Sequence, residues 1–110
     1  MSKIVEVNDH SFDAQVLKSD LIVITLFWAE WNATSRKMMP ILEEIGRDFS
    51  LQTKIAMLDI DANPVPTSNY GVLQVPTLIF FKNGLPVEQI VGVATKEQII
   101  AKFDPYLVKE

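Results

Sequence analysis

The sequence predicts an α/β protein in which a mixed β-sheet carries helices on both of its faces. Three observations support this prediction. Strand-like and helix-like segments alternate through the first half of the chain, as they do where neighbouring strands run parallel. The second half holds two strand-like segments around Lys82-Asn83-Gly84, a strong signal for an antiparallel hairpin. An amphipathic segment near the end then supplies a last helix for one face of the sheet.

The first half of the chain predicts two strands and two helices. Residues 4–7 alternate apolar and acidic side chains, which is typical of a half-buried strand. Residues 11–18 place apolar side chains at helical spacing. Residues 21–29, with the sequence LIVITLFWA, are β-branched and aromatic and predict a buried central strand. Residues 35–49 form a helix with one apolar face, which Pro40 is expected to kink because it removes a hydrogen-bond donor.

The second half predicts the remaining strands and the closing helix. Residues 54–62 form another long strand. Residues 63–71 contain two prolines and a glycine, so at most a short helix or a turn fits there. Residues 77–93 form the hairpin. Residues 95–108 form an amphipathic helix that opens on a threonine cap, and Pro105 breaks or restarts its last turn.

Composition excludes several classes of function. The 110 residues predict a single domain over residues 1–110, and a net charge of −4 without a basic run argues against nucleic acid as a partner. The longest apolar run is too short to span a membrane, and the N-terminus lacks an apolar signal core, so we expect a cytoplasmic protein. The chain has no cysteine, which excludes disulfides, thiolate metal sites and thiol catalysis.

Asp59, Asp61 and Asn63 have the opening spacing of a calcium-binding loop. The glycine that such a loop requires is replaced by Pro64, and its bidentate glutamate by Tyr70. We therefore expect no metal ion and no other cofactor.

Several short motifs lie along the chain between residues 27 and 92. They are Phe27-Trp28-Ala29-Glu30-Trp31, Pro40, Asp59-Ile60-Asp61 with Asn63-Pro64, Tyr70-Gly71-Val72, Val75-Pro76-Thr77, Phe81-Lys82-Asn83-Gly84 and Gly92. With these motifs the chain resembles the thioredoxin family over nearly its whole length. The resemblance implies the thioredoxin fold, an α/β architecture with a mixed central sheet of about five strands and helices on both faces. It also implies that Pro76 is the family's cis-proline, which faces the active-site turn and helps to bind extended peptide.

The active-site motif departs from the family. Where the family has Trp-Cys-Gly-Pro-Cys-Lys, this chain has Trp-Asn-Ala-Thr-Ser-Arg over residues 31–36. Asn32 and Ser35 stand in place of the two cysteines, Leu26 replaces a buried aspartate, and Met57 replaces a lysine. Dithiol exchange needs a thiolate, a second thiol and a nearby base, so these positions cannot support it. We interpret residues 32–35 as the cap of a helix and the catalytic positions as vestigial.

The resemblance implies a partner-binding patch where the active site would lie. Trp31 and Pro76 are its centre, and the apolar rim is expected to include Ile60, Val75, Gly92, Val93 and Ala94, with Gln74 beside it. The alternative for Trp31 is that it only shields the helix behind it. A hydrolase built on Ser35 would need a base, and the only histidine, His10, stands at the start of the first predicted helix, where nothing places it near the turn.

These observations leave several hypotheses of function. The first is a redox-inactive thioredoxin-like scaffold that binds a protein or an extended peptide, as a monomer or weak dimer. The alternative is a thiol-disulfide oxidoreductase whose cysteines were replaced in this chain or are supplied by a partner. The third is a structural subunit of a stable complex.

Overall fold

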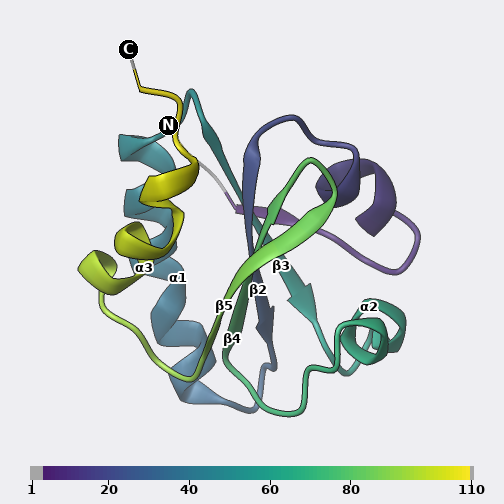
Figure 1. The fold of residues 1–110 in the computed structure, drawn as a ribbon. Coiled ribbons are helices and arrows are strands. Elements are labelled where there is room, and N and C mark those ends of the chain that lie inside the picture. The colour runs from purple at the N-terminus through teal and green to yellow at the C-terminus, as the bar shows by residue number, and fades with distance from the viewer. Residues whose placement is uncertain (1–3, 110) are drawn as a thin grey trace.

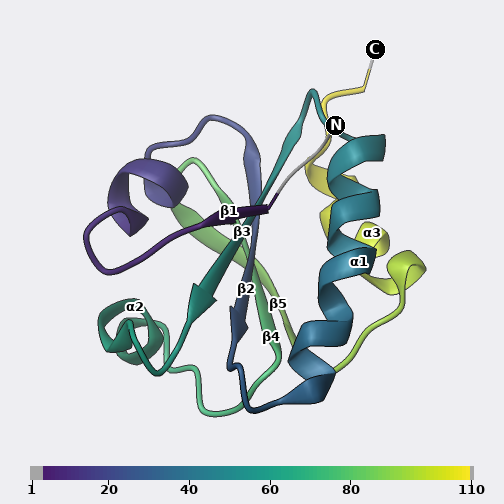
Figure 2. The ribbon, with the colours of Figure 1, turned by 180° about the vertical axis from the view of Figure 1, so that it is seen from behind.

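The computed structural model of the protein describes residues 4–109. Its elements, in chain order, are β1 (Ile4–Glu6), η1 (Asp13–Leu17), β2 (Ile22–Trp28), α1 (Ala33–Asp48), β3 (Thr53–Asp59), α2 (Pro64–Asn69), β4 (Thr77–Lys82), β5 (Leu85–Val91), α3 (Lys96–Phe103) and η2 (Asp104–Tyr106). The strands form one sheet in the order β1-β3-β2-β4-β5. β1, β3 and β2 run parallel, whereas β4 is antiparallel to β2 and to β5. Helices α1 and α3 cover one face and η1 with α2 covers the other (Figure 1, Figure 2), which confirms the predicted fold.

Strand β2 is the centre of the sheet and is buried on both faces. From Ile22 to Phe27 none of its residues is exposed. Its alternate side chains enter two separate cores: Ile24 packs beneath α1 and α3, whereas Val23 packs beneath η1 and α2. The β-branched and aromatic sequence of this strand suits such a position, because it offers an apolar side chain to both faces.

Helix α1 presents one apolar face to the sheet, with Met38, Leu42 and Ile45 fully buried. Pro40 lies inside the helix on its exposed side. The ammonium group of Lys96, at the start of α3, joins the two helices by binding the carboxylates of Asp48, at 2.8 Å, and Glu44. Those two carboxylates raise the pKa of Lys96.

Several boundaries differ from the predicted ones. Residues 11–18 form only the π-helical segment η1, which the backbone N–H of Lys18 closes by bonding to the carbonyl of Asp13. Strand β3 ends at Asp59 rather than continuing to residue 62, because the Asp59 carboxylate accepts the backbone N–H groups of Asp61 and Ala62 and turns the chain. The last helix stops at Phe103, and η2 follows it.

The hairpin and the last helix begin as the sequence predicts. Asn83 and Gly84 form the two-residue turn between β4 and β5 with φ angles of 54° and 81°. Turns of this kind need positive φ at both central residues, which Asn and Gly adopt most readily. Helix α3 opens with a capping box in which the Thr95 hydroxyl accepts the Gln98 N–H and the Gln98 side chain accepts the Thr95 N–H.

Candidate functional site

The strand register brings several chain segments together at one end of the sheet. Thr77, the first residue of β4, pairs with Phe27 near the end of β2 and with Val91 at the end of β5. Trp28 pairs with Asp59, the last residue of β3. The chain that leaves β2, β3 and β5 therefore meets the chain that enters β4 (Figure 1).

Trp31 is the largest exposed apolar side chain at this end of the sheet. It is 68% exposed, and its indole Nε1 donates a hydrogen bond to Asp61 Oδ2 at 2.7 Å. The backbone supports the same arrangement, because the Ile60 N–H bonds to the Trp28 carbonyl at 3.0 Å. Ile60 itself is half-buried against the core under η1 and α2. Trp31 is thus attached to the loop after β3 by its polar edge and leaves much of its apolar surface in solvent.

The Val75–Pro76 peptide bond is cis, and Pro76 is buried. The Pro76 carbonyl accepts the Gly92 N–H at 2.8 Å, which joins the entry of β4 to the exit of β5. Val75 and Gly92 are partly exposed and Val93 is 64% exposed. Pro76 therefore positions the neighbouring segments and offers little surface of its own.

The exposure of three residues differs from the predicted rim. Ala94 is buried, with 8% of its surface exposed, because it packs into the core beneath α1 and α3. Its inclusion in the exposed rim was wrong. Leu73 was not predicted and is 95% exposed, in the loop that leads to Pro76. A single leucine in a loop has no periodicity from which its exposure could be read, so the sequence offered no signal for it. Val91, 51% exposed at the end of β5, was missed in the same way.

Exposed apolar side chains therefore lie on the segments that meet at this end of the sheet. We call this surface the apolar face and define it by the side chains of Trp31, Leu73, Val91 and Val93. Apolar side chains exposed singly are ordinary, but a group of them on adjoining segments is typical of a binding surface.

The turn that would carry the thiols is a helix cap. The Asn32 side chain accepts the backbone N–H of Ser35 at 2.7 Å and so caps α1. Ser35 is fully buried, and its hydroxyl has no hydrogen-bond partner among residues 4–109. A serine nucleophile needs a base in contact with its hydroxyl, so this arrangement does not support a hydrolase.

The space behind the cap is apolar. Leu26 and Met57 are direct neighbours in the β2–β3 register. Leu26 is fully buried, and Met57 packs against the same core beneath α1 and α3. Trp28 also packs against that core, as predicted, although its indole N–H finds no hydrogen-bond acceptor within the described residues. Leu26 and Met57 thus place only hydrocarbon and thioether groups where the resemblance implies an aspartate and a lysine.

The acidic loop after β3 is a structural turn. The Asp59 carboxylate accepts two backbone N–H groups, and the Asp61 carboxylate accepts the Trp31 indole. Across residues 4–109 no cluster of three or more histidine, aspartate or glutamate side chains is placed to hold a metal ion. Over the same range no helix combines the length and apolar character needed to cross a membrane.

Comparison with known proteins decides the family. The family described as Thioredoxin matches residues 3–105. The chain belongs to the thioredoxin family. It is 44% identical to a thioredoxin of Rickettsia bellii over 94 residues, covering 86% of this chain and 90% of that protein. It is 36% identical to a thioredoxin of Synechocystis over 107 residues, covering 97% and 100%. A protein named thioredoxin 2 from Chlorobaculum tepidum is 34% identical over 96% of both chains.

Replacement of Asn32 tests the helix cap. We expect Asn32→Ala to lower the free energy of unfolding by about 1 kcal/mol, because the Ser35 N–H loses its acceptor. The measurement is urea unfolding followed by circular dichroism. Asn32→Asp is the matched control, since a carboxylate is also a good cap and should leave stability unchanged or higher. Equal losses in both variants would contradict a capping role.

Replacement of Ser35 tests the buried hydroxyl. We expect Ser35→Ala to leave the free energy of unfolding unchanged or to raise it by up to about 1 kcal/mol, because a buried hydroxyl without a partner is unfavourable. Thr77→Val is the contrasting variant. The buried Thr77 hydroxyl donates to the Gln74 carbonyl at 2.7 Å, so its loss should lower stability by about 1 kcal/mol or more. A Ser35→Ala loss as large as that of Thr77→Val would show that the Ser35 hydroxyl has a partner.

Proposed function

We propose that this thioredoxin-family protein is redox-inactive and binds a protein or an extended peptide through the apolar face. One observation carries the proposal: exposed apolar side chains lie on the segments that meet at the end of the sheet where the Val75–Pro76 bond is cis, although the thiol positions at that end form a helix cap. This end of the sheet thus offers an apolar surface for a partner, but it lacks the two thiols and the base that dithiol exchange needs.

The redox-inactive part of the proposal follows from chemistry. Exchange of a disulfide needs a thiolate to attack it and a second thiol to release the mixed disulfide. The chain has no cysteine, Asn32 uses its side chain to cap α1, and the Ser35 hydroxyl contacts no base within residues 4–109. The apolar neighbours Leu26 and Met57 offer no proton acceptor. The thiol and proton-transfer groups of the reaction are therefore absent, and Asn32, Leu26 and Met57 occupy their positions as a helix cap and as core packing.

The binding part follows from the surface. Trp31, Leu73 and Val93 come from separate connections between strands and helices, and all three are more than half exposed. Covering such side chains removes apolar area from water, which favours association. Trp31 adds a large, rigid ring of the kind that dominates binding energy in protein interfaces.

A thiol-disulfide oxidoreductase whose cysteines were replaced in this chain or are supplied by a partner is the second candidate. It is favoured by the relatives, which are named as thioredoxins at 34–44% identity over most of the chain. In that case the thiols would belong to the natural sequence or to a partner. A structural subunit is the third candidate, and a partner that purifies with the chain in fixed stoichiometry would favour it. The cytoplasmic location stays a prediction.

Reduction of insulin by dithiothreitol tests the first part. We expect the pure protein to give the rate of the uncatalysed reaction, because no thiolate is available to attack the insulin disulfides. The measurement is the turbidity of released insulin chains, with a cysteine-containing thioredoxin as the positive control. A rate above that of dithiothreitol alone would contradict redox inactivity.

Affinity capture from cell lysate tests the second part. We expect Trp31→Ala and Leu73→Ser to reduce the recovery of bound proteins at least about tenfold, because each removes exposed apolar area from the same surface. The matched control is Leu51→Ser. Leu51 is 90% exposed but lies before β3, at the opposite end of the sheet. Recovery that falls equally in Leu51→Ser, or stays constant in all variants, would place the contact elsewhere. Pro76 is unsuited to this test because it is buried.

A further inference from the structure

Trp31 and Asp61 form a hydrogen-bonded pair that places a negative charge at the edge of the apolar face. The Asp61 carboxylate accepts the indole N–H at 2.7 Å, and both residues are exposed. Trp31 is 68% exposed, so much of its ring remains accessible to a ligand while its N–H is bonded. A cation above an indole is attracted by its π electrons. Here the adjoining carboxylate adds a negative charge to the same place.

The charges around the pair favour a cation. Asp59 precedes Asp61 by two residues, and its carboxylate faces the backbone of the same loop through the bonds to the Asp61 and Ala62 N–H groups. Within residues 4–109 neither aspartate forms an ion pair with a lysine or an arginine. The nearest base in sequence to Trp31 is Arg36, and its guanidinium donates to the Glu30 carbonyl at 3.2 Å rather than to either aspartate. The loop after β3 therefore retains uncompensated negative charge beside the exposed ring.

We propose that the Trp31–Asp61 pair is a subsite for a lysine or arginine side chain of the bound partner. The occupant of the apolar face is then an extended segment in which an apolar side chain stands next to a basic one. The apolar residue covers Leu73 and Val93, and the basic group lies over the indole within reach of the Asp61 carboxylate. Complementary charge at the edge of an apolar patch selects among partners more than it adds affinity. This inference rests on the proposed function, because it names the partner of the same surface.

Synthetic peptides test the subsite. The probes are short, end-blocked peptides with the sequence Gly-Ser-Ala-Val-Xaa-Leu-Ser-Gly, in which Xaa is lysine, glutamine or glutamate. Affinities come from titrations followed by the backbone amide signals of 15N-labelled protein. We expect the lysine peptide to bind about fivefold more tightly than the glutamine peptide at low salt, and the glutamate peptide to bind most weakly. Salt at about 0.5 M should reduce the preference, because the contact is exposed.

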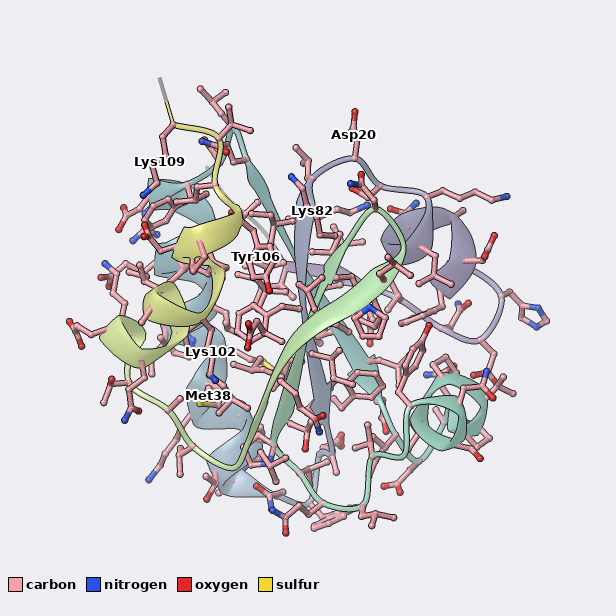
Figure 3. The ribbon with its side chains drawn as sticks, viewed as in Figure 1. Asp20, Met38, Lys82, Lys102, Tyr106 and Lys109 are labelled. Atoms are coloured by element: carbon pink, nitrogen blue, oxygen red, sulfur yellow. The ribbon has the colours of Figure 1, made fainter. Side chains whose placement is uncertain are left out.

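Two variants test whether the preference for the lysine peptide depends on Asp61. Asp61→Asn keeps an acceptor for the indole N–H and removes the charge, so it should bring the affinity for the lysine peptide down to that for the glutamine peptide. Asp20→Asn is the control. Asp20 is exposed and precedes β2, at the opposite end of the sheet, where Figure 3 shows it near Lys82 and the hairpin turn. Its replacement removes the same charge from the molecule and should leave the preference unchanged.

The outcomes separate this inference from the proposed function. If all three peptides bind equally and Trp31→Ala weakens them all, the apolar face binds peptide and the cation subsite is wrong. A preference for the glutamate peptide would also overturn the subsite and would assign the selection to a basic group such as Arg36. If no peptide shifts the amide signals around Trp31, Leu73 and Val93, both the subsite and peptide binding by this face are contradicted.

Discussion

The burial of β2 on both faces is the constraint on which the rest of the structure depends. A strand with no exposed residue from Ile22 to Phe27 must have a neighbour on each edge and a layer of helices on each side. The parallel neighbour β3 ends beside the end of β2, and the antiparallel neighbour β4 begins there. The backbone hydrogen bonds between these strands thus bring their ends together near Trp31, and this does not depend on which side chains occupy the turn. This explains how the fold and its surface persist without the thiol chemistry.

The interior behind the turn is apolar where the resemblance to the family implies an aspartate and a lysine. A buried carboxylate or ammonium group is costly to remove from water, so an apolar pair there is neutral or stabilising once the reaction is gone. Leu26 and Met57, neighbours in the register, form such a pair. The replacement is incomplete, since among residues 4–109 the Ser35 hydroxyl and the Trp28 indole N–H are still buried without partners. Within that range the Ser35 hydroxyl and the Trp28 indole N–H are therefore unpartnered polar groups beside an apolar core.

The sequence predicted those parts of the fold that local chemistry decides. The β2 run, the Asn83-Gly84 turn and the Thr95 cap each contain their own signal, and all three lie where expected. Features that depend on distant contacts were harder to predict. The end of β3 depends on which backbone groups the Asp59 carboxylate accepts. The exposure of Leu73 and the burial of Ala94 depend on packing between segments, and an apolar side chain suits either environment.

Under the proposed function, the absence of cysteine changes what the apolar face must achieve. A thioredoxin that forms a mixed disulfide holds its partner by a covalent bond, so its non-covalent contacts only have to guide the encounter. A chain without cysteine has only non-covalent contacts, and these must offset the lost freedom of both molecules. A few exposed apolar side chains supply little selectivity, because any apolar segment can cover them. The Trp31–Asp61 pair joins a ring to a charge through a hydrogen bond between two loops, and in the proposed subsite it supplies the selectivity that apolar contact alone lacks.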